Sequence, residues 1–198
     1  MNLRQATPSD VPSIVSIHNS AFQGFFLTSL GSNFLGFYYS CFINSGEAVV
    51  VVAEEEGKAL GFSAASTQCK GFNSKLIKRN LLQFGMVALK MLFNSPKALL
   101  RLVKNLTKKG DKAEDDENYA ELYSIGVADN QQGKGIGKCL LKETEQLLKA
   151  KGVEKVSLTT DYYDNAVTLG FYRSMGYETL YEFVTYPNRK MYRLIKIL

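Results

Sequence analysis

The stretch of sequence that decides the fold is LYSIGVADNQQGKGIGK, which runs from Leu122 to Lys138. It opens with alternating apolar residues, a pattern that is typical of a strand. Asp129 and Asn130 end this strand in a turn. Three glycines then follow at every second position, and an apolar-periodic helix begins after them. The stretch therefore predicts a strand, a glycine-rich loop and a helix N-terminus, in that order.

The glycine-rich loop suits the binding of an anion. The first N–H groups of a helix lack partners within the helix, and the helix dipole places partial positive charge there. Gly133, Gly135 and Gly137 have no Cβ atom, so a phosphate group could approach the backbone closely. Lys134 and Lys138 add full positive charges. We expect the loop to bind a pyrophosphate or a similar group.

The spacing of the glycines distinguishes between phosphate-binding loops. A P-loop ends in Gly-Lys-Ser/Thr, but Cys139 follows Lys138 here. A dinucleotide-binding loop requires G-x-G-x-x-G, which this sequence does not contain. The spacing that fits is Q-x-x-G-x-G, from Gln132 through Gly135 to Gly137. This loop resembles the coenzyme A (CoA) loop of the GNAT acetyltransferase superfamily.

Two neighbouring segments carry the same resemblance. The sequence ELYSIGV at residues 121–127 resembles the fourth strand of that family. Asn165 and Tyr172, followed by Met-Gly-Tyr at 175–177, resemble its N-(x)6-Y…GF segment. Thr168 stands where the family often has alanine, which is a mild departure. The resemblance therefore covers the donor-binding part of the chain and leaves the acceptor barely encoded.

The order of helical and strand patterns predicts an α/β (α+β) fold, with a mixed central sheet flanked by helices. The chain has 198 residues without an internal repeat or linker, so we expect a single GNAT-like domain over residues 1–198. The predicted helices span about 10–22, 32–43, 136–151 and 166–175. The predicted strands span 3–6, 48–54, 60–67, 121–127, 153–160, 178–185 and 190–197.

An insertion at about residues 70–118 separates the third predicted strand from the fourth. Its pattern predicts two amphipathic helices within 74–110, a range with nine Lys/Arg and no Asp/Glu. We favour a lid over the acceptor site, because a helix docked on a globular core requires apolar residues. Those residues are Leu99, Leu102, Val103 and Leu106. Contact with an anionic membrane surface and a solvated basic face are the open alternatives.

Composition narrows the other possibilities. Cys41, Cys69 and Cys139 are scattered and lack C-x-x-C spacing, so we expect a reducing, cytoplasmic compartment and no metal site. His18 is the sole histidine and lies in an apolar-periodic helix, which favours a structural or surface role. The polar N-terminus indicates no signal peptide, and no segment reaches ~20 apolar residues. We expect no nucleic-acid partner, and the oligomeric state is open.

The resemblance implies acetyl-CoA as the co-substrate and assigns roles to particular residues. Tyr172 corresponds to the family tyrosine near the sulfur and would protonate the departing thiolate, although a core tyrosine packed on Phe171 is the alternative. Asn165 would contact the coenzyme, a role compatible with capping a helix. The implied CoA-binding residues are Ile125, Gly126, Val127, Gln132, Gly133, Lys134, Gly135, Ile136, Gly137, Lys138, Asn165 and Tyr172.

The general base and the acceptor pocket are less well defined. Strand alternation predicts that Glu121, Tyr123, Ile125 and Val127 share one side of their strand, so Glu121 could take the amine proton directly or through water. A solvated strand-end glutamate is the alternative, and Asp161 is the second candidate base. In the family, the aromatic region at residues 25–44 often lines the acceptor pocket. Packing in the core explains these aromatic residues equally well.

Together these features predict an N-acetyltransferase that moves an acetyl group from acetyl-CoA to a primary amine. The acceptor would be a small metabolite such as an amino sugar, and it would attack directly in a ternary complex. Two alternatives are open. One is acetylation of a protein or peptide amine, and the other is a non-catalytic CoA-binding module that contacts a partner.

Overall fold

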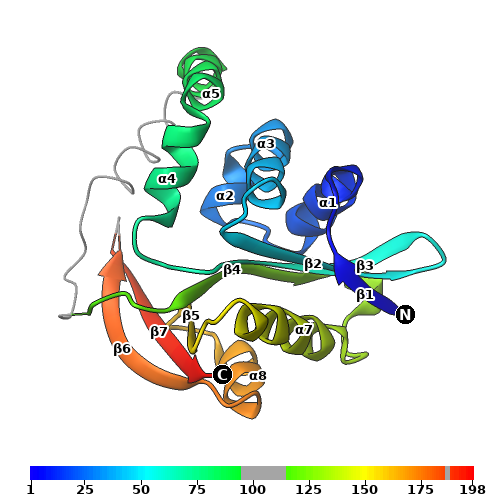
Figure 1. Ribbon diagram of the computed structural model, residues 1–198, viewed down its shortest axis with the longest axis vertical. Coiled ribbons are helices and arrows are strands. Elements are labelled where there is room, and N and C mark those ends of the chain that lie inside the picture. The colour runs from blue at the N-terminus through cyan, green and yellow to red at the C-terminus, as the bar shows by residue number, and fades with distance from the viewer. Residues whose placement is uncertain (95–114, 186–187) are drawn as a thin grey trace.

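A computed structural model describes residues 1–94, 115–185 and 188–198 of the protein, and the strands in these ranges form one mixed sheet (Figure 1). The strand order is β1-β2-β3-β4-β5-β7-β6. The pair β4–β5 is parallel, and every other neighbouring pair is antiparallel. The bounds are β1 Asn2–Gln5, β2 Ala48–Glu55, β3 Lys58–Ser66, β4 Ala120–Val127, β5 Lys155–Asp161, β6 Glu178–Thr185 and β7 Arg189–Ile197.

Helices cover both faces of this sheet. The helices α1 (Val11–Ala21), α2 (Phe26–Ser29) and α3 (Ser32–Ile43) lie on one face, and α7 (Ile136–Ala150) and α8 (Ala166–Ser174) lie on the other (Figure 1). Each face has its own apolar core, in which burial of large side chains drives folding. The predicted fold class, a mixed sheet flanked by helices, is confirmed. No helix among the described residues is long and apolar enough to span a membrane.

The basic insertion differs from its prediction. Before residue 95 it forms two helices, α4 (Phe72–Arg79) and α5 (Leu81–Asn94), where the sequence predicted one. The break falls at Asn80, whose side-chain amide bonds back to Leu76 O at 2.9 Å. The second predicted helix and its leucines fall in residues 95–114, outside the described part of the chain.

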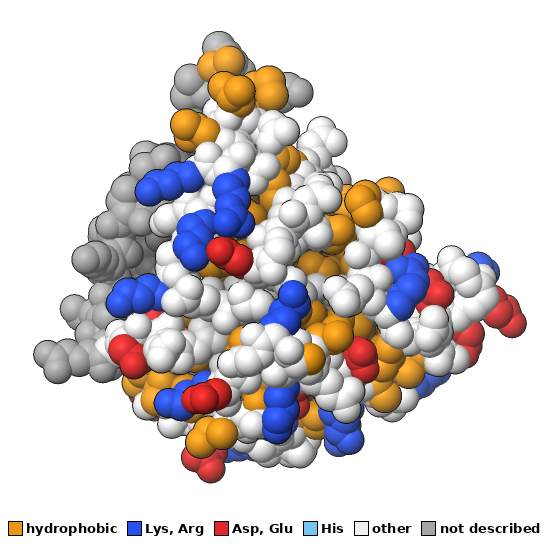
Figure 2. All heavy atoms as spheres, in the orientation of Figure 1, with side chains coloured by type: hydrophobic (Ala, Val, Ile, Leu, Met, Phe, Trp, Pro, Cys, Tyr) orange, Lys and Arg blue, Asp and Glu red, His pale blue; other side chains and the backbone are white. Residues whose placement is uncertain are grey.

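The α5 helix has apolar side chains on the face that packs against α3 and also on a face that is exposed. Phe84 contacts Phe37 of α3, with ring centroids 4.7 Å apart. Leu82 nevertheless is 85% exposed, and Met86 and Leu89 are exposed beside it. Figure 2 shows apolar side chains gathered at this end of the molecule. These three side chains of α5 are therefore exposed and not docked on the domain, whereas the apolar residues on which the lid interpretation rests lie outside the described residues.

Two irregularities of β4 shape the centre of the sheet. Its pairing with β5 stops at Leu122, opposite Leu158, so the two strands separate beyond that point. A bulge against β3 places Ala64 opposite Ser124 and Ala65 opposite Leu122, which leaves Tyr123 without a register partner.

Because of this bulge, the prediction that Glu121, Tyr123, Ile125 and Val127 share one side of β4 is wrong. Because the bulge inserts one residue into the alternation, Tyr123 packs with the α1–α3 core. Ile125 and Val127 pack with the α7–α8 core instead. The prediction was wrong because strand alternation presumes regular pairing, which the sequence of β4 alone does not guarantee.

Candidate active site

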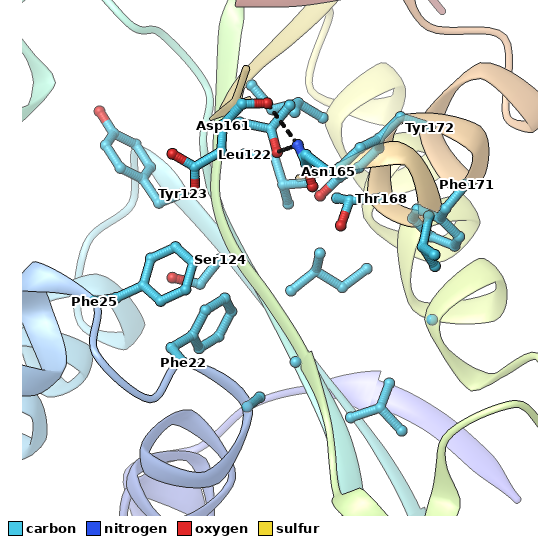
Figure 3. A pocket seen from close by; sticks show the side chains of 18 of the residues that line it. Phe22, Phe25, Leu122, Tyr123, Ser124, Asp161, Asn165, Thr168, Phe171 and Tyr172 are labelled. Atoms are coloured by element: carbon cyan, nitrogen blue, oxygen red, sulfur yellow. Dashed lines mark hydrogen bonds between the residues drawn. The ribbon is translucent and has the colours of Figure 1, made fainter. Parts of the chain in front are cut away.

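A cavity of about 990 Å³ opens where β4 separates from β5. One half is lined by the loop and first turn of α7 at residues 131–133 and 135–138, by the end of β5 at 158–161, and by α8. The other half is lined by residues 21–22 and 25–27. Figure 3 shows Phe22 and Phe25 on one side of β4 and Phe171 and Tyr172 on the other. A continuous cavity therefore joins the two faces of the sheet.

The glycine-rich loop forms a cradle at one end of the cavity. Gly133 and Gly135 have φ values of +78° and +80°, a conformation that favours glycine. A Cβ atom at either residue would meet nothing within 4 Å, so the space above the loop is open. Gly135 directly precedes α7, whose first N–H groups lack partners within the helix. The residues present fit a bound pyrophosphate.

The backbone of β4 forms the floor between the two halves. Beyond Leu122 it has no pairing with β5, so an extended chain could add to its free edge as a strand does. Gly126 is needed here, since a Cβ atom would lie 3.1 Å from Phe62 and 3.3 Å from Phe22. The sequence analysis named Gly126 only as a residue that would contact CoA. The structure adds a second reason for glycine at this position, since two aromatic rings lie close to its Cα atom.

Tyr172 projects from α8 into the cavity (Figure 3). Its ring is held by Phe171 and Tyr177, at centroid distances of 5.0 and 5.5 Å. Burial raises the pKa of its hydroxyl, so the group stays protonated at neutral pH. Among the described residues the structure gives this hydroxyl no hydrogen bond. A protonated, unengaged phenol at a cavity wall can donate a proton or a hydrogen bond to a ligand.

Asn165 joins the end of β5 to the start of α8. Its Nδ2 donates to Thr160 Oγ1 and to Asp161 O, both at 2.7 Å. The side chain does not cap α8, so the predicted capping role is not met. Among the described residues the structure gives its side-chain oxygen, Oδ1, no hydrogen-bond donor, and Asn165 lines the cavity.

The two candidate bases are both paired with arginines. Glu121 accepts from Arg193 Nη1 at 2.9 Å and from Cys69 Sγ at 3.1 Å, and it does not line the cavity. Asp161 does line the cavity and is bound through both oxygens by Arg189. The arginine partners lie on β7, far away in sequence, so sequence alone did not reveal them.

Most of the predicted CoA-binding residues lie together at the cavity. Those that line it are Ile125, Gly126, Val127, Gln132, Gly133, Gly135, Ile136, Gly137, Lys138, Asn165 and Tyr172. Lys134 does not line the cavity, and its Nζ donates to Gln131 Oε1 at 2.9 Å. Within the described ranges, no group of three or more His, Cys, Asp or Glu side chains could hold a metal ion.

The aromatic region divides between the two roles that the sequence left open. Phe25, Phe26 and Leu27 line the cavity, while Tyr39 and its neighbours in α3 are buried in the core. The sequence analysis did not single out other lining residues for a role there. They include Phe22, Ser124, Phe171 and Arg189. His18, for which the sequence favoured a structural or surface role, is buried and also lines the cavity.

Comparison with known proteins places this architecture in a family. The model of the Acetyltransferase (GNAT) family matches residues 11–177. Mycothiol acetyltransferase of Saccharomonospora viridis is 38% identical over 66 residues, which are 33% of this chain and 21% of that protein. The matched segment thus spans about a fifth of that relative's length.

Solved structures agree on the fold. The ribosomal-protein-alanine N-acetyltransferase of Brucella melitensis has a TM-score of 0.66 at 20% identity, with 100% of both chains covered. The PaiA N-acetyltransferase of Thermoplasma acidophilum, solved in complex with coenzyme A, has a TM-score of 0.55 at 14% identity, covering 100% of this chain and 98% of its own. The chain belongs to the GNAT acetyltransferase family, as its sequence predicted.

Proposed function

We propose that this protein transfers the acetyl group of acetyl-CoA to a primary amine of a small metabolite, such as an amino sugar. The observation that carries the proposal is the single cavity that joins the glycine cradle, the free edge of β4 and Tyr172 to an aromatic chamber. Donor and acceptor could therefore meet in a ternary complex, and the amine could attack the thioester directly.

The donor half supplies three functions. Backbone N–H groups at the start of α7, with Lys138, would bind the pyrophosphate. The free edge of β4 at Ile125 and Val127 would pair with the pantetheine arm, and a backbone N–H near Ile125 would donate to the thioester oxygen. Tyr172 would donate its proton to the sulfur as the carbon–sulfur bond breaks.

The acceptor half supports a compact substrate. Phe22 and Phe25 lie edge to face, with centroids 5.7 Å apart, and present apolar surface to the cavity. Arg189 lies 5.0 Å above the Phe25 ring and binds Asp161, so a polar ion pair borders that apolar surface. The apolar face of a sugar ring could lie on the aromatic surface, with its hydroxyls near the ion pair.

Glu121 is the proposed base, acting through water, because its carboxylate lies beside Tyr123, which lines the cavity. Glu121→Gln is expected to lower kcat by ~10²-fold. Asp161→Asn is measured in parallel. If only the Asp161 variant loses turnover to this extent, Asp161 is the base. Melting temperatures report any cost of leaving Arg193 buried without its partner.

A panel of amines tests the proposed function. Thiol release from acetyl-CoA is measured with glucosamine, with spermidine and with a peptide that begins with alanine, and products are identified by mass spectrometry. We expect amine-dependent release with glucosamine. Faster acetylation of the peptide would support the second candidate, a peptide N-acetyltransferase, whose basis is the fold shared with ribosomal-protein-alanine acetyltransferases. Tight CoA binding without turnover of any amine would instead favour the non-catalytic module.

A further inference from the structure

A chain of three buried side chains runs from α1 through α3 to the bulge of β4. His18 Nδ1 lies 2.7 Å from the Tyr39 hydroxyl, and Tyr39 donates to Ser124 Oγ at 3.1 Å. His18 is 2% exposed, Tyr39 is fully buried and Ser124 is 5% exposed. The residues lie 21 and 85 positions apart in sequence, so only the fold brings them together.

The inner end of this chain is fixed and uncharged. The His18 ring packs on Phe22 at 4.6 Å and on Phe62 at 6.4 Å between ring centroids. Burial lowers the pKa of His18 to about 4, so the imidazole is neutral at physiological pH and is a weak base. Its Nε2 is buried, and within the described part of the chain it has no hydrogen-bond partner, which is costly in a folded protein. A buried polar chain with an unpaired atom calls for an explanation beyond packing.

The outer end of the chain is Ser124, at the wall of the acceptor half. Ser124 lines the cavity, and Figure 3 shows its side chain on the side of β4 where Phe22 and Phe25 lie. A serine hydroxyl has one hydrogen and two lone pairs, and Tyr39 occupies one lone pair. Among the described residues the structure gives Ser124 Oγ no other partner. One lone pair and the hydrogen are therefore left for a ligand in the cavity.

Two other polar atoms of residues on this wall are buried, whereas the Arg189–Asp161 ion pair lies at its border. Among the described residues neither the Tyr123 hydroxyl nor His18 Nε2 has a hydrogen-bond partner, and both atoms are buried although their residues line the cavity. The remaining lining side chains from α1, the loop after it and α2 are apolar: Ala21, Phe22, Phe25, Phe26 and Leu27. Ser124 thus supplies this apolar wall with a hydroxyl held in a fixed orientation.

We propose that Ser124 is a catalytic residue that accepts an N–H hydrogen bond from the attacking amine, and that Tyr39 and His18 are the positioning residues that fix its hydroxyl. This inference rests on the proposed acetyl transfer. Ser124 orients the nitrogen lone pair toward the thioester carbon and does not itself take the proton. A hydroxyl that is free to rotate would hold the amine less well, so the buried chain behind it matters for rate.

The test compares Ser124→Ala with Tyr39→Phe and with the double variant, using whichever of glucosamine, spermidine and the alanine peptide wild type acetylates fastest. Ser124→Ala is expected to lower kcat/KM for the amine by ~10²-fold, while KM for acetyl-CoA stays unchanged. Tyr39→Phe lowers kcat/KM for the amine by ~10-fold. The double variant matches Ser124→Ala, because Tyr39 acts through Ser124.

Two further variants separate this role from packing. Ser124→Thr keeps the hydroxyl and is expected to restore most of the activity. Ser63→Ala is the matched control, since Ser63 is a fully buried serine of β3 that bonds Thr144 at 2.5 Å and does not line the cavity. It should lose stability and keep its kcat.

Full activity in folded Ser124→Ala, or additive losses in the double variant, would overturn the inference while leaving the proposed function intact. Wild-type protein that acetylates none of the three amines would remove the proposed function itself, and the role of Ser124 with it.

Discussion

Gly135→Val is expected to lower the affinity for CoA by at least ~10²-fold. The branched side chain would fill the open space above the loop, where the pyrophosphate is proposed to lie. Loss of two charge-assisted hydrogen bonds, at about 1.5 kcal/mol each, accounts for a change of this size. Titration calorimetry with CoA measures it, and circular dichroism checks that the fold is retained.

A matched control separates the lost site from strained backbone. Gly135 has a φ of +80°, so valine is strained there whatever it blocks. Gly152 has a φ of +81°, follows the other end of α7, and also has nothing within 4 Å of an added Cβ atom. Gly152→Val should therefore lose comparable stability and bind CoA normally. CoA affinity that is unchanged in Gly135→Val, or lost equally in both variants, would contradict the proposed pyrophosphate site.

Tyr172→Phe is expected to lower turnover by ~10²-fold and to leave CoA affinity unchanged. The variant keeps the ring that packs between Phe171 and Tyr177 and removes only the hydroxyl. A positioned proton donor contributes a factor of this order. Because burial raises the pKa of Tyr172, the wild-type acid stays protonated across ordinary assay conditions, and its own titration should not limit kcat below about pH 10.

Tyr177→Phe is the control for this experiment. Tyr177 is also a buried tyrosine, but its hydroxyl donates to Glu145 at 3.0 Å and it does not line the cavity. Loss of the Tyr177 hydroxyl should reduce the stability of the protein and leave the kcat of the folded enzyme unchanged. Wild-type turnover in Tyr172→Phe would return that residue to a packing role.

The sequence predicted the strand, glycine loop and helix at 122–138 because each signal there is local. Apolar alternation, glycines and a helical period depend on neighbours within a few residues. The structure adds that Gly133 and Gly135 adopt positive φ, which explains why glycine is required at both positions. The donor half of the cavity was therefore largely predictable, apart from Lys134.

The acceptor half depended on contacts between distant segments, which no local pattern encodes. The bulge at Tyr123 arises from the register with β3. Glu121 meets Arg193, which lies 72 residues away, so its ion pair was not visible in the sequence. The sequence around Ser124 does not predict its proposed role, because a serine in a strand is common. The role depends on the hydrogen bonds from Tyr39 and His18, which only the fold brings together.

A crystal structure of the protein with bound CoA tests the central claim most directly. The account predicts the pyrophosphate at the N–H groups of Ile136, Gly137 and Lys138, with the pantetheine arm along the free edge of β4. It predicts the sulfur within hydrogen-bond reach of the Tyr172 hydroxyl, facing the chamber of Phe22 and Phe25. CoA bound elsewhere, or with its sulfur remote from Tyr172, would contradict the account.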